Sequence, residues 1–94
     1  MRVMEIRLHA TLRQTAQTRA VVLETRRDAT VGDALRALVA SHPALRPSIF
    51  DEHGALVGHV AVVLDGRDIR HLGGVATPLG EAQHLDVFPP VGGG

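Results

Sequence analysis

The last seven residues, Phe88-Pro89-Pro90-Val91-Gly92-Gly93-Gly94, are the part of the chain whose residue types and spacing could do chemistry. Proline has no backbone N–H and a fixed φ, so a strand that ends near Phe88 cannot continue into Pro89 and Pro90. Glycine has no Cβ, so the three terminal glycines form the thinnest and most permissive backbone available. Such an end fits a channel too narrow for any side chain. There a partner enzyme could convert the Gly94 carboxylate into an acyl adenylate, which a nucleophile then attacks.

We therefore divide the chain into a folded domain, residues 1–88, and a flexible tail, residues 89–94. At ~3.3 Å per residue, the tail reaches roughly 20 Å from the domain. The alternative interpretations are a frayed end without function and a remnant of cloning. The two prolines before the glycines, together with the domain pattern described below, favour a functional tail.

The composition excludes several classes of function. Ten basic and ten acidic residues give a net charge of zero, which removes the electrostatic case for nucleic acid as a partner. No apolar run approaches the ~20 residues of a membrane span. Glu5 lies where a secretory signal would have its apolar segment. We therefore expect a cytoplasmic protein that binds neither nucleic acid nor membrane.

The chain has no cysteine, and all ten basic residues are arginines. Disulfides, a catalytic thiol and thiolate metal ligands are therefore excluded, and any sulfur that the chain handles must be carried elsewhere than on a side chain. Without lysine, no side chain offers an ε-amine to the chain's own tail. The six histidines show neither i,i+4 helical spacing nor a chelating cluster, so we predict no metal site.

The N-terminal part of the chain predicts a β-hairpin. Residues 3–10 alternate between apolar and polar types, as is typical of a half-buried strand. The apolar face consists of Met4, Ile6, Leu8 and Ala10. Polar residues 11–18 predict a turn or loop, and residues 20–24 predict the second strand.

The clearest helix begins at Thr30, a good N-cap residue that has Asp33 three positions later, close to the capping-box pattern. The apolar positions at helical spacing are Val31, Ala34, Leu35, Leu38 and Val39. Pro43 ends the helix, because the residue before a proline resists helical geometry. Residues 44–50 predict a short helical turn. Its apolar members, expected to make only weak contacts at the border of the core, are Leu45, Ile49 and Phe50.

The C-terminal part predicts three more strands. The apolar, β-branched run at residues 59–64 is typical of a buried strand, and Asp65-Gly66 after it is a preferred pair for a type I′ turn. Residues 67–70 form a short partner strand in this interpretation, and a glycine-containing loop follows. Residues 84–88 form the last strand, which leads directly into the tail.

This order of elements predicts an α+β domain in two layers, with one main helix on one face of a mixed sheet of four or five strands. If the last strand lies beside the first, these two strands are parallel and central. The tail then leaves from the most buried part of the sheet.

Four stretches carry a resemblance to a known family. They are Leu8-His9-Ala10-Thr11-Leu12-Arg13, Ala29-Thr30-Val31-Gly32-Asp33-Ala34-Leu35, Asp65-Gly66-Arg67-Asp68 with the later Leu72-Gly73-Gly74 and Thr77-Pro78-Leu79, and the ending Asp86-Val87-Phe88-Pro89-Pro90-Val91-Gly92-Gly93-Gly94. In this order, the chain resembles the ubiquitin-like β-grasp sulfur carriers of the MoaD/ThiS family. It is most similar to the small subunit of molybdopterin synthase, because Phe-Pro-Pro before a terminal Gly-Gly is specific to that branch.

The resemblance implies that the chain is a carrier or co-substrate and is not catalytic alone. A ubiquitin-activating-like adenylyltransferase would use ATP to adenylate Gly94, next to Gly93, and sulfur from a persulfide would then give a thiocarboxylate. The tail would enter the large subunit of molybdopterin synthase and donate this sulfur for synthesis of the molybdenum cofactor. The chain itself would bind neither a cofactor nor a metal.

The resemblance also assigns partner binding to the stalk. The residues concerned are Phe88, Pro89, Pro90, Val91 and Gly92. Phe88 is the candidate anchor, because aromatic residues are enriched in interface cores, and its alternative role is packing into the core at the strand end. Gly92 departs from the family, which usually has a residue such as alanine there, and its extra freedom raises the entropy cost of docking by ~1 kcal/mol at most.

Other functions use the same tail chemistry. The chain could be a ubiquitin-like modifier that is joined to lysines of target proteins, or a thiocarboxylate donor for tRNA thiolation or thiamine synthesis. A plain interaction domain with a dispensable tail is a further alternative, and it predicts that deletion of Gly93-Gly94 changes nothing downstream. The acceptor of the activated carboxylate stays open among these at this point.

Overall fold

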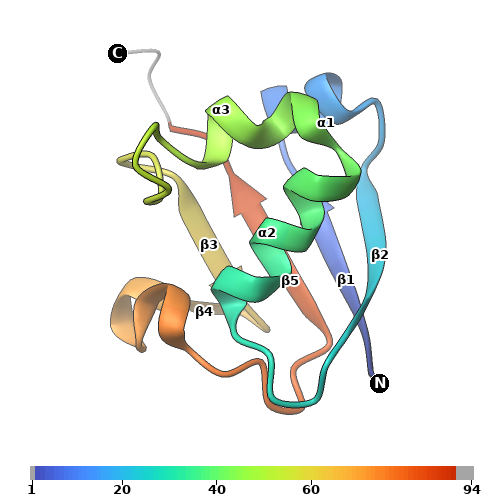
Figure 1. Ribbon diagram of the computed structural model, residues 1–94, viewed down its shortest axis with the longest axis vertical. Helices are drawn as coiled ribbons and strands as arrows, with labels where there is room; N and C mark the ends of the chain where they lie inside the picture. Colours follow the sequence, from blue (N-terminus) through green and yellow to red (C-terminus); the bar gives the residue numbers. More distant parts are fainter. Residues whose placement is uncertain (1, 91–94) are drawn as a thin grey trace.

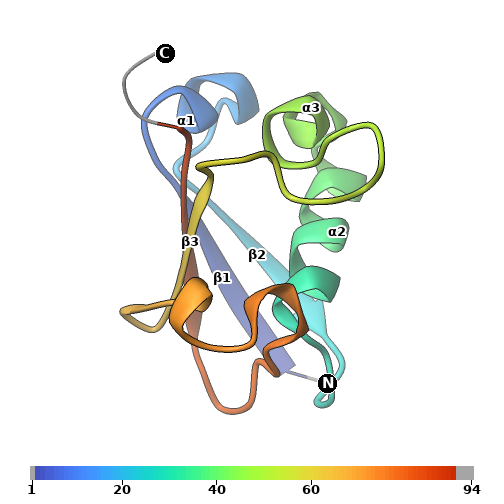
Figure 2. The ribbon, with the colours of Figure 1, turned by 90° about the vertical axis from the view of Figure 1, so that its left-hand side faces the viewer.

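The computed structural model describes residues 2–90, which form a mixed sheet covered on one face by helices (Figure 1). The strands are β1 (Arg2–Leu8), β2 (Ala20–Thr25), β3 (Ala61–Leu64), β4 (Arg67–Asp68) and β5 (His84–Phe88), in the spatial order β2-β1-β5-β3-β4. The view turned by 90° shows two layers, with the sheet on one side and helix α2 (Val31–Ser41) on the other (Figure 2). The expected two-layer α+β architecture is confirmed, with five strands.

β5 lies in the middle of the sheet, as expected if the last strand pairs in parallel with the first. It pairs in parallel with β1, where Ile6 is opposite Leu85, and antiparallel with β3, where Val62 is opposite Val87. β1 in turn pairs antiparallel with β2. Because β5 has a hydrogen-bonded neighbour on both sides, the last strand before the tail is held on both edges.

α2 begins as its capping signal predicted. The Asp33 backbone N–H donates to Thr30 Oγ1 at 3.2 Å, and the Thr30 N–H donates to Asp33 Oδ2 at 2.9 Å, which together form a capping box. The helix ends at Ser41, and His42 already has φ −131° before Pro43. The predicted boundaries of the main helix are confirmed.

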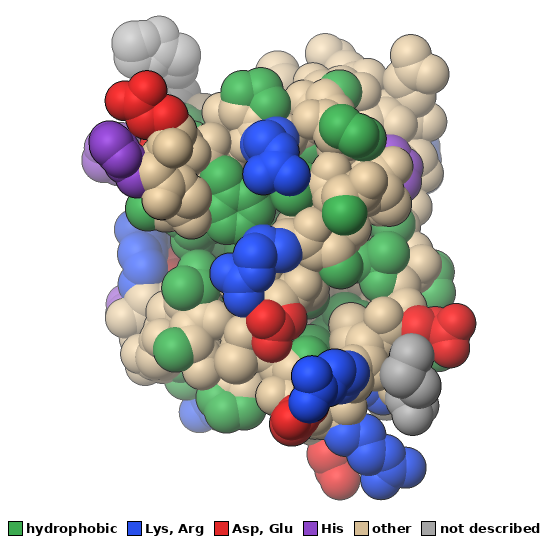
Figure 3. All heavy atoms as spheres, viewed as in Figure 1, with side chains coloured by type: hydrophobic (Ala, Val, Ile, Leu, Met, Phe, Trp, Pro, Cys, Tyr) green, Lys and Arg blue, Asp and Glu red, His purple; other side chains and the backbone are tan. Residues whose placement is uncertain are grey.

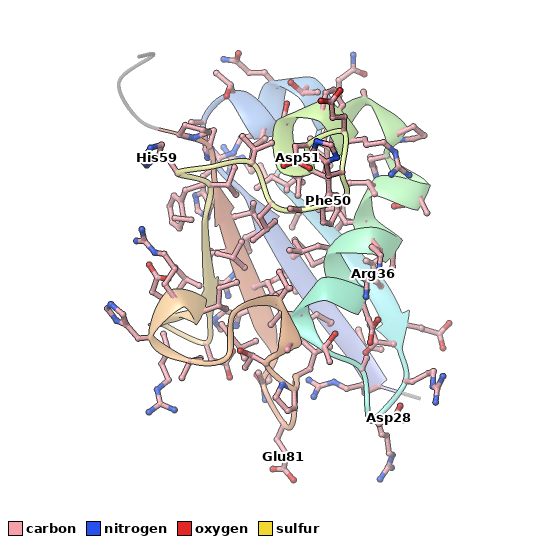
Figure 4. All side chains as sticks on the ribbon, turned by 60° about the vertical axis from the view of Figure 1, so that its left-hand side comes forward. Asp28, Arg36, Phe50, Asp51, His59 and Glu81 are labelled. Carbon is pink, nitrogen blue, oxygen red and sulfur yellow. The ribbon has the colours of Figure 1, made fainter. Side chains whose placement is uncertain are left out.

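The core lies between the sheet and α2. Its members include Met4, Ile6, Leu8, Val62, Leu85 and Val87 from the strands and Val31, Ala34, Leu35, Leu38 and Val39 from the helix. Leu45 and Ile49 are fully buried and Phe50 is only 7% exposed, so the expectation of weak border contacts was wrong. The chain folds back over the core through a 3-10 turn, η1 (Pro43–Leu45), and α3 (Arg46–Ile49), and Phe50 follows directly after α3 (Figure 4).

Residues 11–18 are not the predicted loop, because Thr11–Ala16 form the short helix α1. Only Leu12 of this helix is buried, so it has no apolar stripe that periodicity could detect. Ala10, expected on the buried face of the first strand, is exposed and has φ 53°, because the chain turns there out of β1 into α1. α1 ends at Gln17, which has a left-handed φ of 60°.

The predicted type I′ turn joins β3 to β4. Asp65 and Gly66 both have positive φ, 46° and 84°, as this turn requires. The Asp65 carboxylate also accepts the backbone N–H groups of Gln83 and His84, at 3.1 and 3.0 Å to Oδ1. The turn is thereby fastened to the start of β5.

Both strands of this hairpin are shorter than predicted. β3 begins at Ala61 rather than at residue 59, because His59 has φ 68°, which is incompatible with a strand. β4 ends at Asp68 rather than at residue 70, because the Asp68 carboxylate accepts the Arg70 backbone N–H at 2.8 Å and starts a 3-10 turn, η2 (Ile69–His71). Buried Ile69 belongs to this turn and not to a strand.

The loop after η2 packs against the start of α2. It contains a further 3-10 turn, η3 (Gly74–Ala76), and its backbone is tied to the helix start by the Val31 N–H donating to the Thr77 carbonyl at 2.9 Å. None of the helices in residues 2–90 combines the length and the apolar character needed to cross a membrane.

The helix-covered face carries charges of both signs. Acidic and basic side chains lie beside one another on it (Figure 3), and exposed ion pairs join Arg26 to Asp28 at 3.1 Å and Arg36 to Asp33 at 2.7 Å. Such pairs contribute little to stability.

Candidate functional site: the root of the tail

The candidate site is the end of β5, where the predicted tail leaves the sheet. Val87 is fully buried between Leu8 of β1 and Val62 of β3 in the pairing register, and Phe88, opposite Ala61, is the last residue of the strand. Pro89 is half-buried and Pro90 is exposed, and neither belongs to the strand. The expected strand end at the first proline is therefore confirmed, whereas the role of residues 89–94 as a flexible tail stays a prediction.

The Phe88 side chain lies outside the core. Side chains alternate along a strand, so the inward direction of Val87 places Phe88 on the sheet face away from α2, where it is 36% exposed. The alternative interpretation of Phe88 as a core residue at the strand end is wrong. Its role as a partner-contact anchor stays a prediction, but its exposure fulfils the first requirement for it.

His9 packs directly on Phe88. The two rings are stacked with their centroids 4.2 Å apart and their planes inclined by 12°. His9 Nε2 lies 2.8 Å from Asp86 Oδ1, and these two side chains are 28% and 16% exposed. The root of the tail thus carries an aromatic stack and a contact at hydrogen-bond distance between His9 and Asp86, one more residue of β5.

Sequence reasoning considered His9 only as a metal ligand and missed this arrangement. The available signal was the pairing of β1 with β5, because parallel strands place the residue after Leu8 beside the residue after Val87. Within residues 2–90, no three His, Cys, Asp or Glu side chains come close enough together to hold a metal ion.

The remaining predicted site residues follow Pro90 in the sequence. Val91, Gly92, Gly93 and Gly94 lie outside the described residues, so the reacting carboxylate assigned to Gly94 and the roles of the others stay predictions.

The sheet is hollowed at the end opposite to Phe88. An open hollow of about 550 Å³ is lined by Arg2, Arg27, Gly80, Glu81 and Gln83, at the end of the sheet where β1 and β5 begin. His59, by contrast, lies where the chain enters β3, at the end where β5 finishes (Figure 4). The end of β5 and this hollow therefore lie at opposite ends of the sheet.

Comparison with known proteins supplies the family. The sequence profile of the ThiS family matches residues 6–94. The chain belongs to the ThiS family. Two relatives from Haloferax volcanii match almost the full length. Small archaeal modifier protein 3 is 38% identical over 97% of this chain and 98% of its own length, and small archaeal modifier protein 1 is 43% identical over 97% and 100%.

Solved structures of ThiS-like proteins share the fold. The crystal structure of SAMP1 from Haloferax volcanii matches with a TM-score of 0.88 and 39% identity, covering 99% of this chain and 100% of that one. A putative molybdopterin converting factor subunit 1 from Pyrococcus furiosus matches with a TM-score of 0.75 over 97% of this chain and 100% of its own. Its 22% identity shows a common fold and no more. The fold of this ThiS-family chain is the ubiquitin-like β-grasp, as expected from the sequence.

Proposed function

We propose that this ThiS-family chain is a ubiquitin-like modifier whose terminal Gly94 is joined to lysine side chains of target proteins. A partner adenylyltransferase converts the Gly94 carboxylate and ATP into an acyl adenylate and pyrophosphate. A lysine ε-amine then attacks the carbonyl, AMP leaves and an isopeptide bond forms. Two full-length relatives that carry the name of small archaeal modifier proteins support this choice of acceptor.

The observation that carries the proposal is the geometry at the end of β5. A central strand with neighbours on both sides ends in exposed Phe88 and continues into two prolines. The strand fixes the position from which the chain end extends, and the chain end then enters the active site of an enzyme that activates it. The chain supplies the acyl group and a docking surface, whereas the partner supplies the ATP site.

Conjugation is tested by following the tail onto its targets. An N-terminally tagged chain is expressed in its native host, and tagged species are purified under denaturing conditions. Because Arg70 is the last basic residue, trypsin leaves residues 71–94 attached to each modified lysine as an identifiable mass. We expect such remnants for the full chain and none for a chain that lacks Gly93-Gly94. The proposal fails if the full chain gives no lysine-linked remnant.

A second candidate is sulfur donation for molybdopterin, the function that the Phe88-Pro89-Pro90 ending favours. The outer sulfur of a donor persulfide would attack the same acyl adenylate, so that AMP leaves and an acyl disulfide forms. A thiol of the partner enzyme would then cleave this disulfide, which releases the terminal thiocarboxylate and leaves the partner's two sulfur atoms as a disulfide. The large subunit of molybdopterin synthase would then be the partner and a pyranopterin the acceptor. This chemistry suits a chain without cysteine, because the main-chain terminus carries the sulfur.

Intact mass separates the two candidates. A chain incubated with the adenylyltransferase, ATP, a persulfide donor and a thiol gains the mass of one oxygen replaced by sulfur if it is a sulfur carrier. Persistence of the unmodified mass, with lysine-linked remnants present in cells, leaves the modifier function alone. tRNA and thiazole remain the alternative sulfur acceptors, to be distinguished by the product that incorporates the sulfur.

A further inference from the structure

One residue at the end of β1 contacts three consecutive residues of β5. The His9 backbone N–H donates to the Val87 carbonyl at 3.2 Å, its Nε2 lies 2.8 Å from Asp86 Oδ1, and its ring stacks on Phe88 with 4.2 Å between centroids. These are the last three residues before Pro89. His9 therefore contacts the strand through its backbone and its side chain at the point where the tail begins.

The backbone of Phe88 is paired with β3, but its side chain lies outside the core. Leu85 and Val87 of the same strand are fully buried in the core, whereas Phe88 is on the open face of the sheet. Its direct partner on β3 is Ala61, whose side chain is a single methyl group. On the β1 side, the flat imidazole ring of His9 lies over the Phe88 ring, with 4.2 Å between the centroids.

His9 is itself held in place. The Asp86 side chain, only 16% exposed, lies within hydrogen-bond distance of its Nε2. Arg13 Nε of α1 donates to the Leu8 carbonyl at 3.2 Å, which closes the end of β1 just before His9. The chain then turns sharply at Ala10, with φ 53°. The imidazole is therefore a fixed support for Phe88.

A fixed Phe88 determines where the tail points. The φ of Pro89 is locked by its ring, so the exit direction depends mainly on the backbone of Phe88. The two prolines span about 6 Å, so an error of about 20° at Phe88 would displace the start of the glycine-containing residues that follow them by about 2 Å. Fewer conformers of those residues then reach the activating site, which weakens binding of the carrier.

We infer that His9 is a positioning residue that holds Phe88 by stacking and thereby sets the direction in which the tail leaves the sheet. The inference rests on the proposed function, because it assumes that the tail is threaded into an activating enzyme. The inference concerns how the tail binds in the activating enzyme and not the chemistry of the carboxylate. Loss of His9 therefore raises the KM for the carrier and leaves kcat unchanged.

The test compares three variants in an ATP–pyrophosphate exchange assay with the adenylyltransferase of the same organism. His9→Ala removes the ring. His9→Phe keeps a ring that can stack and loses the contact with Asp86. His84→Ala is the matched control, because His84 lies on the same face of β5 at its other end, with its Nδ1 3.6 Å from Asp65. Thermal unfolding curves show whether each variant is folded under the conditions of the assay.

We expect the KM of His9→Ala to rise about 3- to 10-fold, the loss that corresponds to one aromatic pair, with kcat unchanged. His9→Phe recovers most of this loss, and His84→Ala behaves like the wild type. The inference is overturned if His9→Ala matches the wild type in KM, or if His9→Phe is as impaired as His9→Ala.

A partner-free measurement separates this inference from the proposed function. In His9→Ala, the NMR order parameter of the Phe88 amide falls relative to the wild type, while that of the Leu85 amide does not. An unchanged Phe88 amide overturns the inference whatever the enzyme assay gives. Absence of exchange with the wild-type chain, by contrast, counts against the proposed function and leaves the NMR result to decide on His9.

Discussion

At the scale of single residues, the site depends on which face of the sheet each side chain occupies. Val87 and Phe88 are neighbours in sequence, yet the first is fully buried and the second is 36% exposed. Strand alternation could predict this difference once the strand and its inward face were known. The partner of Phe88 could not be predicted in the same way, because the stack with His9 joins positions 79 residues apart (88 − 9) and depends on strand order.

Because the Phe88 side chain lies on the open face of the sheet, we predict that its removal lowers the activation of the tail more than it lowers the stability of the fold. Phe88→Ala removes an exposed ring and its stack with His9, so we expect the free energy of unfolding to fall by about 1 kcal/mol. Leu85→Ala, at a fully buried position of the same strand, is expected to cost 2–5 kcal/mol, a range of about that size being usual for such truncations. Denaturant unfolding measures both values.

The activity of these two variants should follow the opposite order. Under conditions where both remain folded, ATP–pyrophosphate exchange falls at least about 10-fold in kcat/KM for Phe88→Ala, as expected for an interface anchor, and much less for Leu85→Ala. If Phe88→Ala keeps wild-type exchange, Phe88 is no partner anchor.

At the scale of elements, the sequence predicted those that carry a clear local signal. The structure has the capping box at Thr30 and the turn at Asp65-Gly66, at the positions that the sequence predicted. α1 was missed because it buries one side chain, Leu12, and therefore shows no periodicity. The packing of Phe50 was underestimated because its burial depends on the chain folding back over the core, a tertiary effect that no window of sequence contains.

Gly32 shows how two elements constrain one position. It lies in α2, where alanine usually stabilises a helix by about 1 kcal/mol relative to glycine. A Cβ there would stand 3.2 Å from the Val75 carbonyl oxygen and 3.3 Å from Arg36 Nη1, so η3 would have to move away from the helix. We expect Gly32→Ala to lower the free energy of unfolding by about 1 kcal/mol despite the gain in helix propensity.

The control for Gly32→Ala is Ala40→Gly in the same helix. Ala40 is exposed, so this change measures helix propensity without packing, and it should cost about 1 kcal/mol. Urea unfolding curves give both values. If Gly32→Ala raises the free energy of unfolding by as much as Ala40→Gly lowers it, η3 does not restrict the side chain at position 32.

The short hairpin should show a pH dependence at its end. Arg70, through its guanidinium and its backbone N–H, holds the pKa of Asp68 at about 2, below the ordinary value of 3.8. A carboxyl group with a lowered folded-state pKa stabilises the fold above its ordinary pKa, and this contribution is lost as the pH falls towards the lowered value. We expect stability to decrease from about pH 4 to pH 2 partly for this reason.

Asp68→Asn isolates this contribution. Asparagine can still accept the Arg70 backbone N–H, but it carries no charge for the guanidinium, which is 2.8 Å from Asp68 Oδ2. The variant should therefore show a shallower loss of stability between pH 4 and pH 2 in thermal unfolding, with little change in the fold at neutral pH. Identical slopes in the wild type and the variant would contradict the assigned role of the pair.

At the scale of the whole molecule, the architecture was predictable but the acceptor was not. The order of strands and one helix indicated a two-layer α+β domain, and the sheet order confirms it. The resemblance favoured a sulfur carrier for molybdopterin, whereas the full-length relatives favour a modifier. Both functions begin with the same activated carboxylate, so the activation chemistry does not distinguish between them and the acceptor must be identified by experiment.

The absence of lysine predicts a property of the conjugates. All ten basic residues are arginines, so an attached copy offers no ε-amine to which a second copy could be joined. We expect each modified lysine to carry a single copy, seen as one shifted species per site on a denaturing gel. Chains of several copies linked through this protein's side chains would contradict the prediction.

A single substitution provides the positive control. Arg19→Lys places an ε-amine at an exposed position between α1 and β2, away from the core. If the activated tail can use any exposed lysine, this variant should give a ladder of species that the wild type lacks. A ladder in both proteins would mean that another group accepts the tail.

The central claim is that the terminal glycine of this chain is activated by a partner enzyme, and ATP–pyrophosphate exchange measures this step most directly. The assay needs only the chain, the adenylyltransferase of the same organism, ATP and labelled pyrophosphate, and it does not depend on the acceptor. We predict exchange that saturates with the wild-type chain and disappears when residues 92–94 are deleted. Equal exchange with and without these glycines, or none with the intact chain, would contradict the account.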